Sequence, residues 1–185
     1  LGEVDGSYAK RHLVPFGEYV PLEQWLRGVI AFFDLPMSRN WPGPGMQAPL
    51  SFKGQPLSLS ICYEIAYPHL VRSAAKEPMA LVTISNDTWF GDSIGPVQHL
   101  QIAQMRALEN GRSLLRVTNN GITAAIDHAG EITDVLPRNQ QGVLQTELVL
   151  VRGDTPYHRF GYGMLGAILI FVSVLNIAAS QWRSQ

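Results

Sequence analysis

The sequence predicts an α/β fold followed by one membrane-spanning helix, and three stretches support this prediction. Residues 57–61 alternate apolar side chains with serines, which is typical of a strand, and they lead through Cys62 into a helical pattern. Residues 79–85 form a continuous apolar run of strand length, as expected for a central strand covered on both faces. Residues 162–179 are almost wholly apolar and carry no charge. Strands that alternate with helices indicate an α/β domain, and the last stretch indicates a bilayer anchor.

The composition limits the classes of function. With 185 residues, of which 46% are hydrophobic, the chain is long enough for one domain with a substantial core. Only 16% of the residues are charged, below the roughly 25% of ordinary domains, which indicates contact with a membrane. The net charge of −1 comes without a basic stripe, so a nucleic-acid partner is not expected. One cysteine excludes an internal disulfide and a cysteine-based zinc site, and the five histidines show no ligand spacing, so we expect no metal ion and no cofactor.

The opening segment combines a lysine with a carboxylate on a restricted loop. Residues 8–21 combine charged and polar groups with a proline-bounded apolar turn, and one structural interpretation of them is an exposed basic strand followed by a loop. Glu18 comes after a Pro-Phe-Gly turn, which would hold its carboxylate in one orientation. Close to Lys10, this carboxylate would keep the ammonium group charged and directed. Because the chain opens at Leu1 without an initiator methionine, we expect it to be the C-terminal piece of a longer protein.

Residues 22–33 carry apolar side chains at helical spacing, with Trp25 and Phe32 among them. Such a helix can belong to the core of a domain. It can equally lie on a bilayer, because aromatic residues favour the membrane interface. Both interpretations stay open at this point. Residues 37–49 are rich in proline and glycine and predict a loop.

Cys62, the sole cysteine, stands between a strand and a helix. Residues 65–76 suit a short helix with Pro68 in its first turn. A strand, a sharp turn and a helix together present a nucleophile, and the N-terminus of a helix favours a thiolate and can donate hydrogen bonds to an oxyanion. The alternative is that this lone cysteine is a small buried apolar side chain.

The second half of the chain predicts one further helix and several short strands. The helix covers residues 97–108, ends at Gly111, and pairs Arg106 with Glu109 at i,i+3. The Asn-Asn-Gly tripeptide at 119–121 predicts a hairpin turn of the type that needs positive φ. The predicted strands are residues 114–118, 122–127, 132–136 and 143–151.

Two segments carry apolar side chains that favour a membrane. Residues 86–92 predict a polar loop with two adjacent aromatic residues, Trp89 and Phe90, which would face a bilayer and bind an apolar substrate there, or would fill the core. The 18 residues at 162–179 rise about 27 Å as a helix, close to the roughly 30 Å of a hydrocarbon core. We therefore predict that this second segment spans a membrane.

Four short motifs resemble those of the nitrilase superfamily. They are Tyr-Ala-Lys-Arg-His-Leu-Val-Pro-Phe-Gly-Glu at 8–18, Cys-Tyr-Glu at 62–64, Asn-Asp-Thr-Trp-Phe-Gly at 86–91 and Arg-Ala-Leu-Glu-Asn at 106–110. Together with the final apolar segment, they resemble one branch of this superfamily closely, the membrane-bound bacterial N-acyltransferases that complete lipoprotein maturation. The similarity extends over nearly all of the chain.

The resemblance implies an αββα sandwich on the periplasmic side of the bacterial inner membrane. Residues 1–158 would be the C-terminal portion of a nitrilase-like catalytic domain. Residues 159–185 would be a C-terminal transmembrane helix and a short tail, with the C-terminus in the cytoplasm.

The resemblance also implies a Glu-Lys-Cys catalytic triad. By the matching motifs, Lys10 would be the catalytic lysine and Cys62 the nucleophile, with Glu18, Tyr63 and Glu64 supporting them. The triad glutamate of the family lies several tens of residues upstream of the lysine, on a part that this chain does not contain. We therefore expect the isolated chain to be inactive.

The implied activity moves a fatty acyl chain from a phospholipid of the phosphatidylethanolamine type to the N-terminal diacylglyceryl-cysteine of an apolipoprotein. A thioester on Cys62 would divide this transfer into two easier steps, and Lys10 would stabilise the tetrahedral oxyanion. Two alternatives remain. A soluble amidase of the nitrilase type would not need the apolar segment at 162–179, and a truncated membrane fragment could bind lipid without catalysis.

Overall fold

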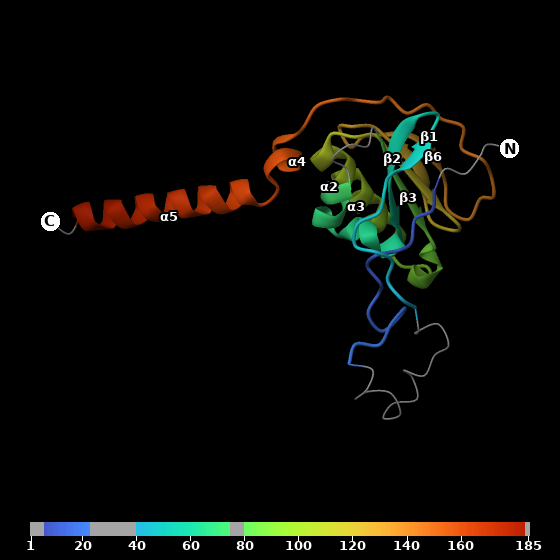
Figure 1. Cartoon of the computed structure of the whole chain (residues 1–185), viewed down its shortest axis with the longest axis horizontal. Coiled ribbons are helices and arrows are strands. Elements are labelled where there is room, and N and C mark those ends of the chain that lie inside the picture. Colours follow the sequence, from blue (N-terminus) through green and yellow to red (C-terminus); the bar gives the residue numbers. More distant parts are fainter. Residues whose placement is uncertain (1–5, 23–39, 75–79, 184–185) are drawn as a thin grey trace.

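The computed structural model describes residues 6–22, 40–74 and 80–183, and it confirms the predicted α/β fold (Figure 1). The helix expected over residues 22–33 lies almost entirely outside the described residues. In chain order the strands are β1 (Leu50–Phe52), β2 (Gln55–Ile61), β3 (Ala80–Ser85), β4 (Leu114–Thr118), β5 (Thr123–Ile126) and β6 (Ile132–Leu136). The helices are the 3-10 helices η2 (Cys62–Ala66) and η3 (Asp87–Phe90), and the α-helices α2 (Pro68–Ala74), α3 (Gly95–Asn110), α4 (Pro156–Phe160) and α5 (Gly163–Arg183).

The strands form a six-stranded sheet in the order β1-β2-β3-β4-β5-β6. β2, β3 and β4 are parallel to one another, whereas β1, β5 and β6 pair antiparallel with their neighbours. The carboxyl ends of the three parallel strands therefore meet at one edge of the sheet, where ligands of open α/β sheets usually bind. Cys62 follows β2, Asp87 lies just after β3, and Asn119 follows β4.

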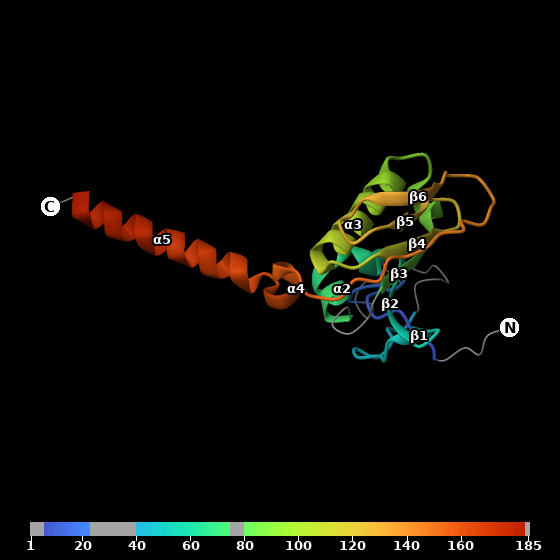
Figure 2. The same cartoon turned by 90° about the horizontal axis from the view of Figure 1, so that it is seen from above.

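The core lies between the sheet and the helices η2, α2 and α3. Its apolar side chains come from both layers and are Ile65, Val71, Leu81, Leu100, Ala103, Ala107, Leu114, Ala124 and Ile126. Figure 2 shows α2 and α3 on the same side of the sheet. One sheet with helices on one face corresponds to half of an αββα sandwich, so the structure is a partial form of the predicted fold.

Helix α3 matches its prediction closely. Pro96 stands in its first turn, where a missing N–H costs nothing, and Gly111 ends the helix with φ 60° and ψ 40°. The left-handed conformation lets the Gly111 N–H reach the carbonyl oxygens of Ala107 and Leu108. Arg106 Nη2 lies 2.8 Å from Glu109 Oε1, as the i,i+3 spacing predicted.

The β4–β5 hairpin is confirmed, but its turn differs from the prediction. None of the residues 119–121 has a positive φ. Pairing stops at Arg116 and Ala124, so the connection is wider than a tight turn. Gly121 is needed for another reason, because a Cβ at this position would overlap the carboxylate of Asp87. A close approach, not a backbone angle, explains the glycine.

Two predicted strands are wrong. Residues 8–14 form no strand, because side chains bind their backbone groups: Gln47 bonds both the N–H and the carbonyl of Ala9, and carboxylates accept three N–H groups further along. Residues 143–151 join no ladder in the described part of the chain. One backbone group of this segment accepts a side-chain hydrogen bond instead, since Ser113 Oγ donates to Val149 O at 2.6 Å.

Helix α5 extends away from the domain (Figure 1). Residues Gly163–Trp182 are long and apolar enough to cross a membrane, and no part of them is buried in the protein. An exposed apolar helix of this length is the element predicted from residues 162–179. The short helix α4 joins it to the domain, and Arg72 of α2 donates to the α4 carbonyls of Tyr157, His158 and Arg159.

Candidate active site

Cys62 occupies a sharp turn directly after β2. It is the first residue of η2 and has φ 52°, a left-handed conformation that a non-glycine residue adopts only at a cost of order 1–3 kcal/mol. The turn between a strand and helical structure agrees with the sequence prediction. Because the conformation is strained, contacts around the turn must hold it.

Glu64 holds the turn from one side. Its carboxylate is fully buried and accepts four hydrogen bonds. Oε1 accepts the N–H groups of Arg11 and His12 at 2.6 and 3.1 Å, and Oε2 accepts the Tyr8 hydroxyl at 2.9 Å and the Ile61 N–H at 2.7 Å. Burial and the Glu64 charge together raise the pKa of Tyr8 to about 12, so this hydroxyl stays a donor. Glu64 therefore ties the opening segment to the residue before Cys62.

Lys10 and Glu18 form a close ion pair in the opening segment. Lys10 Nζ lies 2.7 and 2.6 Å from the two oxygens of Glu18, and only 11% of the lysine side chain is exposed. The Val14 N–H donates to Glu18 Oε2 at 2.8 Å, which fixes the carboxylate in the loop. The predicted proximity of this carboxylate to Lys10 is confirmed.

A cavity of about 420 Å³ lies beside Cys62. Most of its lining is apolar or aromatic, and the lining includes Glu18, Cys62, Tyr63, Trp89 and Phe90. The cavity therefore brings together five of the seven residues selected from the sequence. The other two lie just behind this lining: Lys10 is bound to Glu18, and Glu64 supports the turn from within the protein.

Trp89 and Phe90 belong to η3 and differ in burial. Trp89 is 69% exposed, whereas Phe90 is 37% exposed and packs edge to face against His99 with ring centroids 5.6 Å apart. The partner helix expected around Trp25 lies outside the described residues. Both aromatic rings therefore stand at the cavity, with Trp89 more open to its surroundings.

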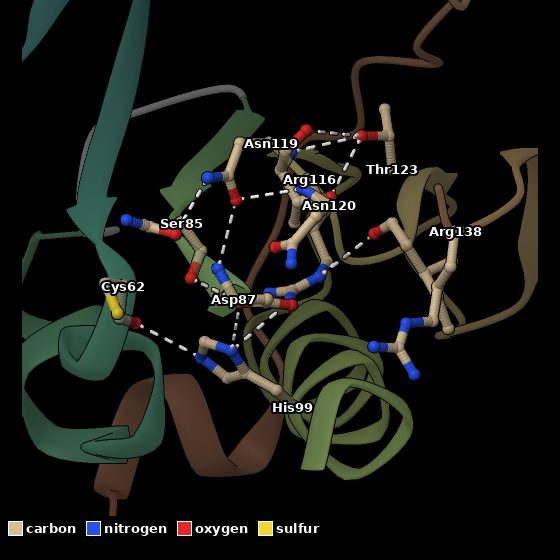
Figure 3. A network of polar contacts seen from close by, with 12 residues as sticks. Cys62, Ser85, Asp87, His99, Arg116, Asn119, Asn120, Thr123 and Arg138 are labelled. Atoms are coloured by element: carbon tan, nitrogen blue, oxygen red, sulfur yellow. Dashed lines mark hydrogen bonds and ion pairs between the residues drawn. The ribbon is translucent and has the colours of Figure 1, made fainter. Parts of the chain in front are cut away.

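Sequence reasoning missed a buried polar network behind Cys62, shown in Figure 3. Asp87 is fully buried; its Oδ2 accepts Arg116 Nη2 at 2.6 Å, and its Oδ1 accepts the Ser85 hydroxyl at 2.6 Å. His99 Nδ1 lies 3.2 Å from Asp87 Oδ1, and His99 Nε2 lies 3.3 Å from the carbonyl oxygen of Cys62. Asp87 could have been found from its position just after a buried strand and within the motif at 86–91. His99 and Arg116 come from other elements, and no local pattern places them beside Asp87.

The network keeps both of its charges. Burial opposes ionisation of Asp87, but the bonds from His99 and Ser85 and the charge of Arg116 outweigh it and hold the Asp87 pKa at about 2. Burial lowers the pKa of Arg116, and the Asp87 carboxylate acts against this shift. A fully buried ion pair is therefore linked to the main chain of Cys62 through His99.

No cluster of three or more histidine, cysteine, aspartate or glutamate residues that could hold a metal ion occurs in the described part of the chain. The described site presents a thiol, an ammonium group, two carboxylates and the buried network. A thiol can act as a nucleophile that forms a covalent intermediate.

Residues 1–155 match the family of carbon-nitrogen hydrolases. The chain belongs to the carbon-nitrogen hydrolase family. Among solved structures, the C. elegans NitFhit protein matches 72% of this chain and 32% of its own, with a TM-score of 0.56 and 20% sequence identity. At this identity the similarity supports the fold of a carbon-nitrogen hydrolase and nothing finer.

Curated relatives of this carbon-nitrogen hydrolase chain are more similar in sequence. An apolipoprotein N-acyltransferase of Pseudomonas paraeruginosa is 51% identical over 175 residues, which cover 92% of this chain and 34% of the relative. Those of Azotobacter vinelandii and Vibrio vulnificus are 52% and 46% identical over 171 and 179 residues, covering 92% and 96% of this chain and 33% and 35% of the relatives. The chain thus spans about a third of the length of these relatives and is homologous to that part of them.

Proposed function

We propose that this chain is the catalytic portion of an N-acyltransferase that moves a fatty acyl chain from a phospholipid to the N-terminal diacylglyceryl-cysteine of an apolipoprotein. The observation that carries the proposal is the apolar cavity beside the strained Cys62, on a chain 51% identical to apolipoprotein N-acyltransferase. An apolar cavity suits an acyl chain, and a thiol at its wall suits a thioester.

In the proposed reaction, the Cys62 thiolate attacks the carbonyl carbon of the phospholipid ester. The lysophospholipid leaves as an alkoxide that takes up a proton, and the acyl chain stays on sulfur as a thioester. The α-amine of the acceptor then attacks the thioester, forms the amide and releases the thiolate after losing a proton. Division into two acyl transfers lowers each barrier relative to direct aminolysis of an ester.

The charged residues near the cavity have separate roles in this proposal. Lys10 stabilises the tetrahedral oxyanion, because its ammonium group is held by Glu18 and is largely shielded from water. Glu64 and Tyr63 support the Cys62 turn and keep it at the wall of the cavity. The proton acceptor for the thiol is the triad glutamate that the family carries upstream of its lysine. Trp89 and Phe90 bind the acyl chain where it enters.

Helix α5 sets the location that we propose. An apolar helix without burial in the protein fits a bilayer, where residues 159–185 anchor the catalytic residues 1–158 to the inner membrane. The catalytic part then lies in the periplasm, with its C-terminus in the cytoplasm. A soluble amidase has no use for such a helix, so α5 favours the acyltransferase over that alternative.

The deciding experiment follows a labelled phosphatidylethanolamine with the complete membrane protein that carries this chain. An acyl adduct that hydroxylamine removes should form on Cys62, and Cys62→Ala should abolish it. Lys10→Ala should slow adduct formation by roughly 10²–10³, as loss of an oxyanion donor does elsewhere. Absence of any adduct in the complete protein would refute the proposal.

The 185-residue chain alone provides the control for the proton acceptor. We expect it to form no adduct at a useful rate, because the upstream glutamate is not part of it. A fast, stoichiometric adduct on the isolated chain would contradict the proposed triad and would identify Glu18 or Glu64 as the base.

A further inference from the structure

The proposed chemistry leaves the buried network behind Cys62 without a role. Asp87 and Arg116 are fully buried, and His99 is 5% exposed, yet none of the three is needed to explain the acyl transfer itself. Burying an ion pair commonly costs as much as the pair returns, so stability alone is a poor reason to keep one. The network does contact the main chain of the nucleophile, through the hydrogen bond between His99 Nε2 and the Cys62 carbonyl oxygen.

The hydrogen bond from His99 has a defined direction. A carbonyl oxygen can only accept, so Nε2 must carry the proton that it shares with Cys62. The other ring nitrogen, Nδ1, lies 3.2 Å from the acceptor Asp87 Oδ1 and 3.2 Å from the donor Arg116 Nη2. It therefore has a partner whether or not it is protonated. In both states His99 keeps an N–H directed at the Cys62 carbonyl.

The rest of the network fixes the orientation of the His99 ring. Asp87 is held by Arg116 and Ser85, and its own N–H bonds Asn119 Oδ1 at 3.2 Å. Gly121 packs so closely on the Asp87 carboxylate that any side chain there would displace it. Phe90 packs edge to face against the His99 ring. The ring can therefore rotate little without breaking several contacts.

We propose that Asp87, His99 and Arg116 are positioning residues that hold Cys62 in its left-handed conformation through the hydrogen bond from His99 Nε2 to the Cys62 carbonyl oxygen. The network fixes the peptide that follows the nucleophile, as Glu64 fixes the Ile61 N–H that precedes it. The strained turn is thereby held on both sides, and the thiol stays at the wall of the cavity. The role of the turn in acyl transfer rests on the proposed function, whereas the structural link between His99 and Cys62 does not.

The geometry separates this role from direct catalysis. The contact of His99 is with the main-chain oxygen of Cys62, so His99 acts through the backbone and not as a base for the thiol. Loss of the network is therefore expected to make the thiol less reactive by relaxing the turn.

The test uses two variants of His99 in the full 185-residue chain in detergent micelles. His99→Gln retains an N–H donor near the position of Nε2, whereas His99→Phe retains a ring against Phe90 but has no donor. The matched control is Gln104→Ala on the same helix, which removes a hydrogen bond from Gln104 Nε2 to another main-chain oxygen, that of Gly130, at 2.8 Å. Circular dichroism and thermal unfolding establish how much of each variant is folded.

The first measurement is spectroscopic. Because Cys62 is the sole cysteine, labelling with [¹³C]cysteine gives one carbonyl resonance, whose chemical shift reports the hydrogen bond that this oxygen accepts. We expect the resonance to move upfield in His99→Phe and to stay close to its original position in His99→Gln and Gln104→Ala. An unchanged resonance in His99→Phe would overturn the proposal.

The second measurement is the rate of alkylation of Cys62 by iodoacetamide, normalised to the folded fraction. We expect His99→Phe to react roughly three- to tenfold more slowly than the unaltered chain, the change expected from losing one hydrogen bond. His99→Gln should recover most of the rate. If His99→Phe were alkylated as fast as the unaltered chain or faster, or if Gln104→Ala lost as much rate as His99→Phe, the network would contribute to packing alone.

His99→Leu serves as a second variant in case His99→Phe does not fold. It also lacks the Nε2 donor and leaves the Asp87–Arg116 ion pair intact, so the carbonyl resonance should move upfield and alkylation should slow. Neither measurement involves a phospholipid. A failure of lipid acylation would therefore count against the proposed function alone, and an unchanged Cys62 carbonyl would count against the network alone.

Discussion

Two fully buried carboxylates, Glu64 and Asp87, flank the Cys62 turn, and they are held in different ways. Glu64 accepts hydrogen bonds from three backbone N–H groups and one hydroxyl, all of them uncharged. Asp87 is held chiefly by side chains, including the cation of Arg116 at 2.6 Å. Glu64 therefore holds backbone groups in place, whereas Asp87 holds neighbouring side chains in place.

The difference shows which of the two carboxylates can be replaced by a neutral side chain with part of its hydrogen bonds kept. Backbone donors stay in place whatever side chains surround them, so a neutral acceptor at position 64 can keep part of the Glu64 arrangement. The Asp87 arrangement depends on charge balance, because removing either ion leaves the other buried without compensation. The two regions should therefore respond differently to changes of charge and to changes of shape.

The largest effect is expected from Arg116→Leu. This change leaves the Asp87 carboxylate buried without its cation and should lower the free energy of unfolding by about 3–5 kcal/mol. Arg106→Leu is the matched control, because its partner Glu109 is partly exposed and already has a pKa raised by burial, so it can take up a proton at little cost. Urea unfolding compares the two, and equal losses would contradict the assigned importance of the Asp87 pair.

A smaller loss is expected from Glu64→Gln. The amide oxygen can still accept the N–H groups of Arg11 and His12, but the amide NH₂ then faces the Ile61 N–H, donor against donor. We expect a loss of about 2 kcal/mol in the free energy of unfolding. Iodoacetamide should also react at a changed rate with the adjacent Cys62. A variant as stable as the unaltered chain would show that the carboxylate does not organise this backbone.

Acid titration should separate the two carboxylates further. The pKa of Asp87 is lowered from 3.8 to about 2, so its contribution to stability is complete above pH 4 and is lost as the pH falls toward 2. The shift corresponds to about 2 kcal/mol. Asp87→Asn should be less stable at neutral pH and should show a flatter loss of stability between pH 4 and 2. Parallel curves for the two proteins would rule out Asp87 as the titrating group.

The smallest effect is expected from Tyr8→Phe. The ring is kept, and only the hydroxyl that donates to Glu64 Oε2 at 2.9 Å is removed. Three backbone donors remain on Glu64, so we expect a loss of about 1 kcal/mol and a normal alkylation rate for Cys62. A loss as large as that of Glu64→Gln would mean that the side-chain donor, and not the backbone, dominates this region.

Local patterns sufficed to predict several parts of the site. The alternation before Cys62 predicted the strand and turn, and the Pro-Phe-Gly sequence predicted a fixed Glu18 close to Lys10. The apolar run near the C-terminus predicted α5. These features depend on residues that are neighbours in the chain, so their physical causes can be read without knowledge of the fold.

The strand prediction for residues 8–14 shows where local patterns mislead. Its sequence is compatible with a strand, but Glu64, more than fifty residues away, takes two of its N–H groups. The same holds for residues 119–121, whose glycine reflects the approach of Asp87 and not a tight turn. In the first case a distant carboxylate decides the backbone conformation, and in the second it decides which residue type fits.

The sequence by itself determined the α/β class, the placement of the cysteine in a turn, the Lys10–Glu18 pair and the exposed apolar helix, because each follows from short-range periodicity or turn chemistry. Only the tertiary structure decided that Asp87, His99 and Arg116 meet behind the nucleophile. They come from three different elements that the parallel strand order brings to one edge of the sheet. Their contact depends on how the sheet and α3 pack, and packing between distant segments leaves no periodic signal in the chain.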